Sequence, residues 1–219
     1  MAGKVFFSVT MSLDGFIAPG SLGELMGRQW MELQRWVFPT RFFRENLKLG
    51  GGGEEGRDND IARETSERTG ASVMGKRMFD AGEQMWPEEA PFHTPVFVVT
   101  HEKRNPWERP GGTTFCFVND GIEAALDQAR EAAGDRDVCI AGGGATILEY
   151  VNAGLIDEFT IALSPVLFGS GIRLFEGVDA GRVALDLVRA EPSPRVTHLT
   201  YAVRLRLSLI HISEPTRPY

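Results

Sequence analysis

The sequence predicts an α/β fold, in the form of a single-domain three-layer sandwich with a mostly parallel central sheet and antiparallel edge strands. Short apolar runs alternate with segments of helical periodicity, which is the pattern of strands joined by crossover helices. The last strand-like segments have no helix between them, so we expect them to be antiparallel at one edge. The chain has 219 residues, 42% of them hydrophobic, which suits one domain with a sizeable core.

The first part of the chain is the less regular one. Residues 4–10 are predicted to form the first strand, and a turn rich in Gly and Pro follows it. Residues 29–49 are rich in aromatic side chains and are predicted to be helical on either side of a proline. Residues 50–60 begin with four glycines and continue with charged side chains, so we expect a flexible loop. Residues 61–69 are predicted to form a polar helix.

From residue 71 onwards, strands and helices alternate. Most strands are short apolar runs, and the helices carry apolar positions three and four residues apart. In the last strand Leu199, Tyr201 and Val203 alternate with Thr200 and Ala202, which predicts that the side carrying Leu199 is buried. The predicted strands are 71–75, 95–100, 113–118, 137–141, 158–163 and 196–207, and the predicted helices are 76–82, 119–134 and 145–154.

The composition disfavours several classes of protein. The net charge is −7 and the pI is about 5.2, whereas a nucleic-acid surface needs a basic stripe. No apolar run reaches the roughly 20 residues of a membrane helix, and the N-terminus resembles a strand rather than a signal peptide. Cys116 and Cys139 fall in predicted strands without zinc-ligand spacing, which favours free thiols in the cytoplasm. We therefore expect a small-molecule substrate and neither a nucleic acid nor a membrane as partner.

The domain is expected to span residues 1–207. Residues 208–219 contain two prolines and carry no packing pattern. We predict that this tail is non-native or disordered, and we leave it out of the functional argument.

Two predicted strands end in residues that suit an anionic ligand. In open α/β sheets, ligands bind at the carboxyl ends of parallel strands, beside the helices that follow. Gly75 ends one strand, and Lys76 and Arg77 begin the next helix, whose dipole already favours anions. Thr100 and His101 end another strand, with further cations close behind.

A third strand end consists of glycines. Gly142, Gly143 and Gly144 lead into a helix that begins with Ala145 and Thr146. Glycine allows a pyrophosphate to approach backbone amides that point outward at a helix start. The triplet is neither the G-x-G-x-x-G fingerprint nor a Walker loop, so by itself it is a weak indication.

Each of these strand ends also has an ordinary interpretation, as a solvated basic turn, an exposed loop or a tight turn. Together they favour one long ligand with several phosphates, such as a dinucleotide. Because cations are abundant at two of the ends, we expect the 2′-phosphate of NADP.

Asp14 is the candidate catalytic residue. It follows the first strand, where a carboxylate beside a cleft can orient a substrate or pass a proton. The alternative is a structural role in an Asp-Gly turn. Aromatic residues between positions 30 and 43 are interpreted either as a pocket for a flat heterocycle or as core.

Four motifs make the chain resemble the dihydrofolate-reductase-like superfamily, and within it the reductase (C-terminal) domain of the bifunctional riboflavin-biosynthesis deaminase/reductase. The resemblance covers roughly residues 3–207. The motifs are SVTMSLDGFIA at 8–18, GASVMGKRMFD at 70–80, PVFVVTH at 95–101 and the long segment from CIAGGGAT to LFEG at 139–177.

The resemblance implies an NADPH-dependent reductase that transfers a hydride to a small pyrimidine- or pterin-like heterocycle. It implies that residues 75–77 face phosphates, that Thr100 and His101 lie near the 2′-phosphoadenosine end, and that residues 142–146 cradle the pyrophosphate. Asp14 would lie in the substrate region. The resemblance also implies a homodimer.

The chain departs from its relatives in ways that leave alternatives open. It has no zinc-deaminase signature, and residues 21–60 form an unusual insertion. Folate reductases carry a carboxylate on a helix after the first loop, and Glu24 and Glu32 are candidates for that position. A dihydrofolate reductase and an NADPH-binding protein without turnover are therefore the alternative functions.

Overall fold

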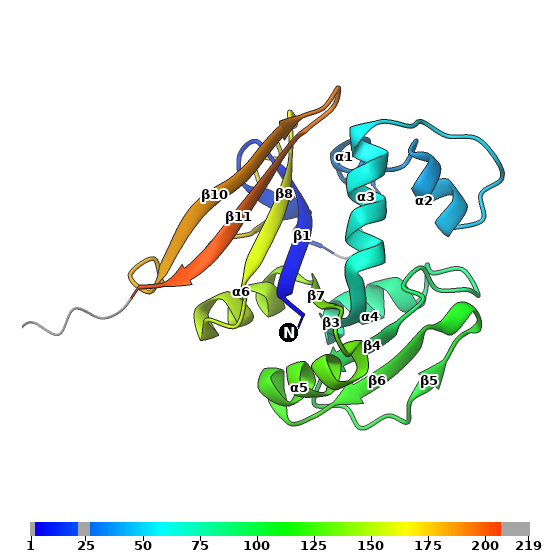
Figure 1. Cartoon of the computed structure of the whole chain (residues 1–219), viewed down its shortest axis with the longest axis vertical. Helices are drawn as coiled ribbons and strands as arrows, with labels where there is room; N and C mark the ends of the chain where they lie inside the picture. The colour runs from blue at the N-terminus through cyan, green and yellow to red at the C-terminus, as the bar shows by residue number, and fades with distance from the viewer. Residues whose placement is uncertain (1–2, 22–26, 207–219) are drawn as a thin grey trace, which may run out of the picture.

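The chain folds as one α/β domain, and our computed structural model describes residues 3–21 and 27–206. A nine-stranded sheet has the order β10-β11-β8-β1-β7-β3-β4-β6-β5 (Figure 1), and a small sheet pairs β2 with β9. The strands are β1 (Val5–Ser12), β2 (Phe16–Ala18), β3 (Thr69–Gly75), β4 (Pro95–Val99), β5 (Trp107–Glu108), β6 (Thr114–Val118), β7 (Asp137–Gly142), β8 (Glu158–Ser164), β9 (Ile172–Arg173), β10 (Val183–Pro192) and β11 (Thr197–Leu205). The helices are α1 (Arg28–Leu33), α2 (Arg41–Asn46), α3 (Arg57–Arg68), α4 (Lys76–Glu83), α5 (Gly121–Ala133) and α6 (Gly144–Ala153), with a 3-10 turn at Pro110–Gly112.

The predicted fold class is confirmed. Strands β8, β1, β7, β3, β4 and β6 are parallel neighbours, while β10 and β11 at one edge and β5 at the other run antiparallel to the strands they pair with. The register aligns the carboxyl ends of the central strands. Gly75 of β3 lies opposite Val99 of β4, and Met74 lies opposite Gly142 of β7. Three predicted ligand-binding ends therefore meet at one edge of the sheet.

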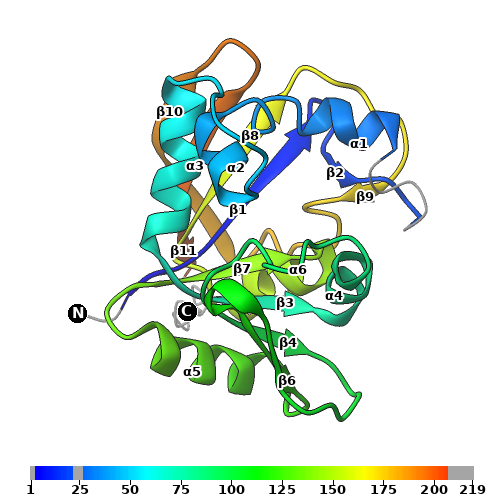
Figure 2. The ribbon, with the colours of Figure 1, turned by 90° about the vertical axis from the view of Figure 1, so that its right-hand side faces the viewer.

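Helices cover both faces of this sheet. Helices α5 and α6 pack on one face, where Leu126 and Ile147 join a core with Val73 and Phe97. Helix α4 packs on the opposite face, where its Phe79 contacts the side chains that alternate with those of the first core. In Figure 2, α1, α2 and α3 gather around β1 and β8, while α5 lies at the opposite end of the molecule.

The insertion is more ordered than its sequence predicts. Helix α3 begins at Arg57, inside the segment expected to be a flexible loop, and it buries Asp58 and Asn59. Its other end is fixed by Arg68, which forms ion pairs with Asp137 of β7 (2.6 Å) and Glu158 of β8 (2.7 Å). The loop prediction was wrong over residues 57–60 because long-range contacts, absent from any local pattern, bury these polar side chains.

The end of the chain holds a second correction. Strand β10 was not predicted, although it pairs with β11 along most of its length. Both sides of β11 are covered, because Tyr201 and Val203 on the predicted side pack partly buried against the main core, while His198 and Thr200 on the other side are buried more deeply. The reason is that the insertion covers the polar side of this strand. The proposed tail at 208–219 lies outside the described residues.

Candidate active site

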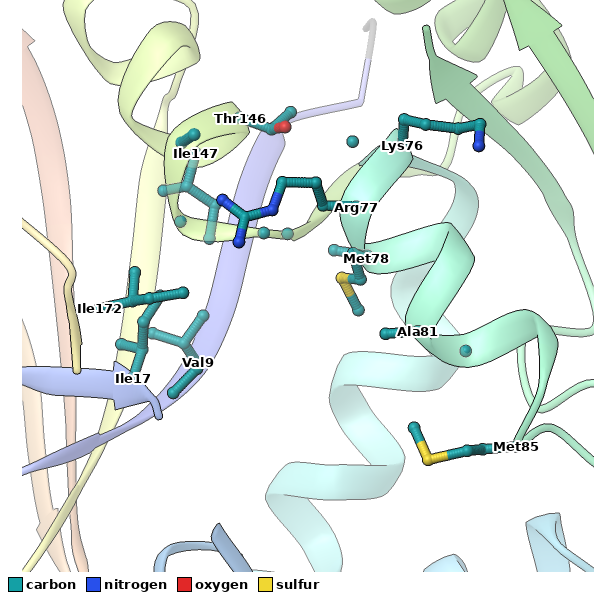
Figure 3. A pocket seen from close by; sticks show the side chains of 18 of the residues that line it. Val9, Ile17, Lys76, Arg77, Met78, Ala81, Met85, Thr146, Ile147 and Ile172 are labelled. Carbon is teal, nitrogen blue, oxygen red and sulfur yellow. The ribbon is translucent and has the colours of Figure 1, made fainter. Parts of the chain in front are cut away.

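One large cleft joins the three predicted strand ends. It has a volume of about 1480 Å³ and receives residues 75–77 from β3 and α4, 100–102 from the end of β4, and 142–146 from β7 and α6. Figure 3 shows Val9, Ile17 and Ile172 on one side of it and the side chains of α4 on the other. The cleft continues to the insertion, which adds an aromatic wall. That wall consists of Trp30, Trp36, Phe38 and Phe43.

The three glycines of the turn before α6 differ in their backbone conformation and in the space around them. Gly142 has φ +127°, which side chains rarely adopt, and a Cβ there would lie 2.9 Å from the sulfur of Met78. A Cβ on Gly144 would lie 3.0 Å from Ile172. A Cβ on Gly143 would meet nothing within 4 Å, so its space is open to the cleft. The peptide between Gly142 and Gly143 is cis.

Helix α6 therefore presents its first backbone amides to open space. The first N–H groups of a helix have no acceptor in the preceding turn and carry the positive end of the helix dipole. Ile147 is the first residue whose N–H is bonded back, to the carbonyl of Gly143. The amides of Gly144, Ala145 and Thr146 are thus suited to an anion.

Strand β3 and helix α6 touch at the cleft. A Cβ built on Gly75 would lie 2.2 Å from Oγ1 of Thr146, so only glycine fits at the end of β3. This contact brings the start of α4 beside the start of α6. Two helix N-termini consequently share one space.

The two predicted cations differ in their surroundings. The ammonium of Lys76 contacts Asp80 (2.6 Å) and Glu102 (2.9 Å), and these hydrogen bonds raise its pKa. Arg77 has no ion pair or hydrogen bond to any residue that the structure describes, and it is exposed. In Figure 3 its guanidinium extends toward Thr146 and Ile147 at the start of α6, while Lys76 points away. Arg77 is therefore the cation that remains available to a ligand.

The end of β4 provides a rim rather than a second cationic group. Thr100 is buried, and its hydroxyl accepts a hydrogen bond from the amide of Glu102 (3.0 Å). His101 is exposed at the edge of the cleft. Arg104, a cation that follows this strand in the sequence, forms an ion pair with Glu83 (2.7 Å).

The structure does not put Asp14 in the cleft. Its carboxylate accepts hydrogen bonds from the Ser12 hydroxyl (2.6 Å) and the amides of Phe168 (3.1 Å) and Gly169 (2.7 Å). These bonds, that from Ser12 first, lower its pKa from 3.8 to about 2. The structure therefore gives Asp14 an anchoring role, because it ties the turn after β1 to the segment after β8, and its substrate role stays a prediction.

Of the two alternative carboxylates, the structure describes Glu32 alone. Glu32 is exposed on α1 and is not among the described residues that line the cleft. Glu24 lies outside the described residues.

Sequence reasoning missed the polar group at the far end of the cleft. The indole Nε1–H of Trp36 donates to the hydroxyl of Thr10 (2.8 Å), which contacts Oε1 of Gln34 (3.0 Å). All three residues line the cleft. The alternation of β1 puts Thr10 on the same face as Phe6, but no local pattern shows that a residue 24 positions later meets it.

Two classes of feature are absent from the described part of the chain. Residues 3–21 and 27–206 hold no group of three or more His, Cys, Asp or Glu side chains arranged to bind a metal ion. Over the same ranges, no helix is long and apolar enough to cross a membrane.

Solved structures with the same fold come from several organisms. A putative riboflavin biosynthesis protein from Shewanella sp. PV-4 gives a TM-score of 0.59 at 24% identity, over 93% of this chain and 99% of that one. Dihydrofolate reductase from Enterococcus faecalis, complexed with NADP(H), gives 0.53 at 13% identity, over 93% and 98%. The Thermotoga maritima diaminohydroxyphosphoribosylaminopyrimidine deaminase/5-amino-6-(5-phosphoribosylamino)uracil reductase gives 0.57 at 15% identity, over 92% of this chain but 56% of that one.

The fold is thus that of a dihydrofolate-reductase-like α/β domain, with its cleft at the carboxyl ends of the central strands. The chain belongs to the RibD C-terminal domain family, whose model matches residues 3–199. This is a family of reductases. Among curated proteins, the chain is 27% identical to the uncharacterized protein YyaP of Bacillus subtilis (strain 168) over 136 residues, which is 59% of this chain and 71% of that protein.

Proposed function

We propose that the chain is an NADPH-dependent reductase that transfers a hydride to a small pyrimidine- or pterin-like heterocycle, in the manner of 5-amino-6-(5-phosphoribosylamino)uracil reductases. The observation that carries the proposal is the meeting of residues 75–77, 100–102 and 142–146 in one cleft. The likeness to a dihydrofolate reductase complexed with NADP(H) supports it.

The residues present fit a phosphorylated dinucleotide. The open space at Gly143 and the unpaired amides at the start of α6 would hold its pyrophosphate. Arg77 would meet a phosphate with a charge-assisted hydrogen bond, and His101 lies at the rim for the adenosine end. When bound, NADPH supplies the hydride, so the protein's task is to bind and orient both partners.

The rest of the cleft suits a flat substrate. The aromatic wall defined above and the apolar side chains of Val9 and Ile17 line the same cleft. Among the described residues that line the cleft, the carboxylates are Glu102 and Glu149, which lie on the side of α4 and α6 rather than beside the aromatic wall. The chemistry therefore depends on orientation, which aligns the donor and acceptor carbons, more than on a general acid or base.

The test is a titration with NADPH followed by a turnover assay. We expect saturable quenching of tryptophan fluorescence by NADPH, and loss of NADPH absorbance when an aminopyrimidine-type substrate is added. Oxidation with dihydrofolate instead would favour the dihydrofolate reductase alternative. NADPH binding with no turnover on either class of substrate would favour the binding protein, and no binding at all would refute the proposal.

We also propose that the chain forms a homodimer through β10. This strand is an edge of the sheet, and it exposes Leu185, Leu187 and Val188, the last of these 62% exposed. An exposed apolar edge strand is a site for pairing with another chain unless it is protected. A second copy would bury these side chains.

The proposed location is the cytoplasm. Cys116 in β6 and Cys139 in β7 are free thiols. Burial raises the pKa of both, that of Cys139 to about 12, so they stay protonated and unreactive. Unpaired thiols are typical of reducing compartments.

A further inference from the structure

A buried chain of hydrogen bonds fixes the orientation of one amide in the cleft. An indole N–H can only donate, so Trp36 Nε1 donates to the hydroxyl oxygen of Thr10. The hydroxyl has a single proton, and Oε1 of Gln34 stands 3.0 Å away to accept it. The side-chain oxygen of Gln34 is therefore occupied by the hydrogen bond from Thr10.

The amide nitrogen of Gln34 is left for a ligand. Gln34 lines the cleft, and its Nε2 carries two protons with no acceptor among residues 3–21 and 27–206. The opposite orientation would give the Thr10 oxygen two donors and leave its own proton without an acceptor. The hydrogen-bond chain therefore presents N–H donors to the space beside the aromatic wall.

The two residues that hold Gln34 are themselves buried and packed. Thr10 is 6% exposed and Trp36 is 9% exposed. The ring of Trp36 packs edge-on against that of His198 at 4.9 Å, and His198 Nε2 contacts a carboxylate oxygen of Asp58 at 2.7 Å. Because these groups are packed, Gln34 cannot easily turn its oxygen toward the cleft.

We propose that Gln34 is a specificity residue, which donates hydrogen bonds to a ring carbonyl of the substrate, and that Thr10 and Trp36 are positioning residues for it. The inference rests on the proposed function, whose substrate class it narrows. A ring that presents carbonyl oxygens satisfies these donors. A protonated 2,4-diaminopyrimidine presents N–H groups and a positive charge instead, so it would leave the donors of Gln34 unpaired.

The matched variants are Gln34→Glu and Gln34→Met. Glutamate keeps the shape and accepts the Thr10 proton with one oxygen, but it offers the cleft an anionic acceptor in place of a donor. Methionine keeps most of the volume and removes both functions. Thermal unfolding of each variant checks that the fold is kept.

The probes are 5,6-diaminouracil and 2,4-diaminopyrimidine, titrated by calorimetry into protein saturated with NADPH. The wild type is expected to prefer the uracil. Gln34→Glu should weaken uracil binding about tenfold and strengthen diaminopyrimidine binding by a similar factor, which reverses the preference. Gln34→Met should weaken uracil binding about fivefold with no gain for the other ligand. Thr10→Val should lower uracil affinity about threefold, and less in the Met background, because it acts through Gln34.

A reversal of preference is a result that mere structural damage does not produce. An unchanged preference in Gln34→Glu, or a wild type that binds neither probe, would overturn the inference. NADPH affinity, measured separately in each variant, should stay constant. If NADPH fails to bind the wild type, the proposed function itself fails, and the two failures are distinguished.

Discussion

Gly75→Ala tests whether the end of β3 and the start of α6 meet as described. A Cβ at this position would lie 2.2 Å from Thr146 Oγ1, about 1.2 Å short of an ordinary contact. Thr146 is β-branched, so rotation about χ1 gives limited relief. We expect a loss of stability of about 2 kcal/mol, which for a chain of this size lowers Tm by about 4 to 8 °C.

The double variant gives the sharper result. Thr146→Ala removes the clashing oxygen, and the remaining Cβ lies at 3.5 Å, an ordinary contact. Gly75→Ala in that background should therefore cost much less, with a coupling of at least about 1 kcal/mol in urea unfolding. Gly51→Ala, where an added Cβ meets nothing within 4 Å, is the matched control and should be nearly neutral. Additive effects of Gly75→Ala and Thr146→Ala would refute the contact, and with it the shared site of α4 and α6.

Three further predictions concern binding, pH and assembly. Arg77→Ala should weaken the binding of NADPH by tenfold or more and the binding of NADH less, and equal losses for both cofactors would argue against a 2′-phosphate contact. Lys76→Ala should have a smaller effect on NADPH binding, because Asp80 and Glu102 already neutralise that ammonium. The pKa of Asp14 is lowered from 3.8 to about 2 on folding, so the stability that its carboxylate contributes is complete above about pH 4 and is lost as the pH falls toward 2. In urea unfolding between pH 5 and pH 2, Asp14→Asn should therefore lose less stability than the wild type, and parallel curves would contradict this. Leu187→Asp should convert the expected dimer to a monomer in light scattering, and a monomeric wild type would refute the assembly.

Local patterns predicted the regular half of the fold and missed the edge. Strands β3 and β4 are continuous buried runs, and β6 and β7 are short apolar segments in which buried and partly buried residues are interspersed, so all four are recognisable in the sequence. In β10, Val183, Leu185 and Leu187 alternate with other residues, and this alternation was the available indication of a strand. A bulge between Leu187 and Arg189 shifts the register and breaks the pattern.

One part of the candidate site was likewise predictable from local sequence patterns, and the other part was not. Its phosphate-binding part was predictable, because a glycine turn and the helix after it are neighbours in sequence and their chemistry is carried by the backbone. Its other part is assembled from Thr10, Gln34 and Trp36, and His198 supports it from a strand 162 residues after Trp36. His198 has no partner that local spacing identifies, and only the docking of α3 brings Asp58 to it.

It follows that the insertion contributes residues to the candidate site and is not a separate appendage of the fold. If Asp58 is replaced by Asn, His198 keeps a neutral acceptor, whereas Asp58→Ala leaves the buried Nε2 of His198 unpaired and should cost about 1 to 3 kcal/mol. Because Trp36 packs on that imidazole, Asp58→Ala should also reduce binding of the carbonyl heterocycle while leaving NADPH affinity unchanged. Calorimetry with both ligands separates these effects. Equal losses for the two ligands would mean that the insertion supports the whole sheet and not the substrate end of the cleft.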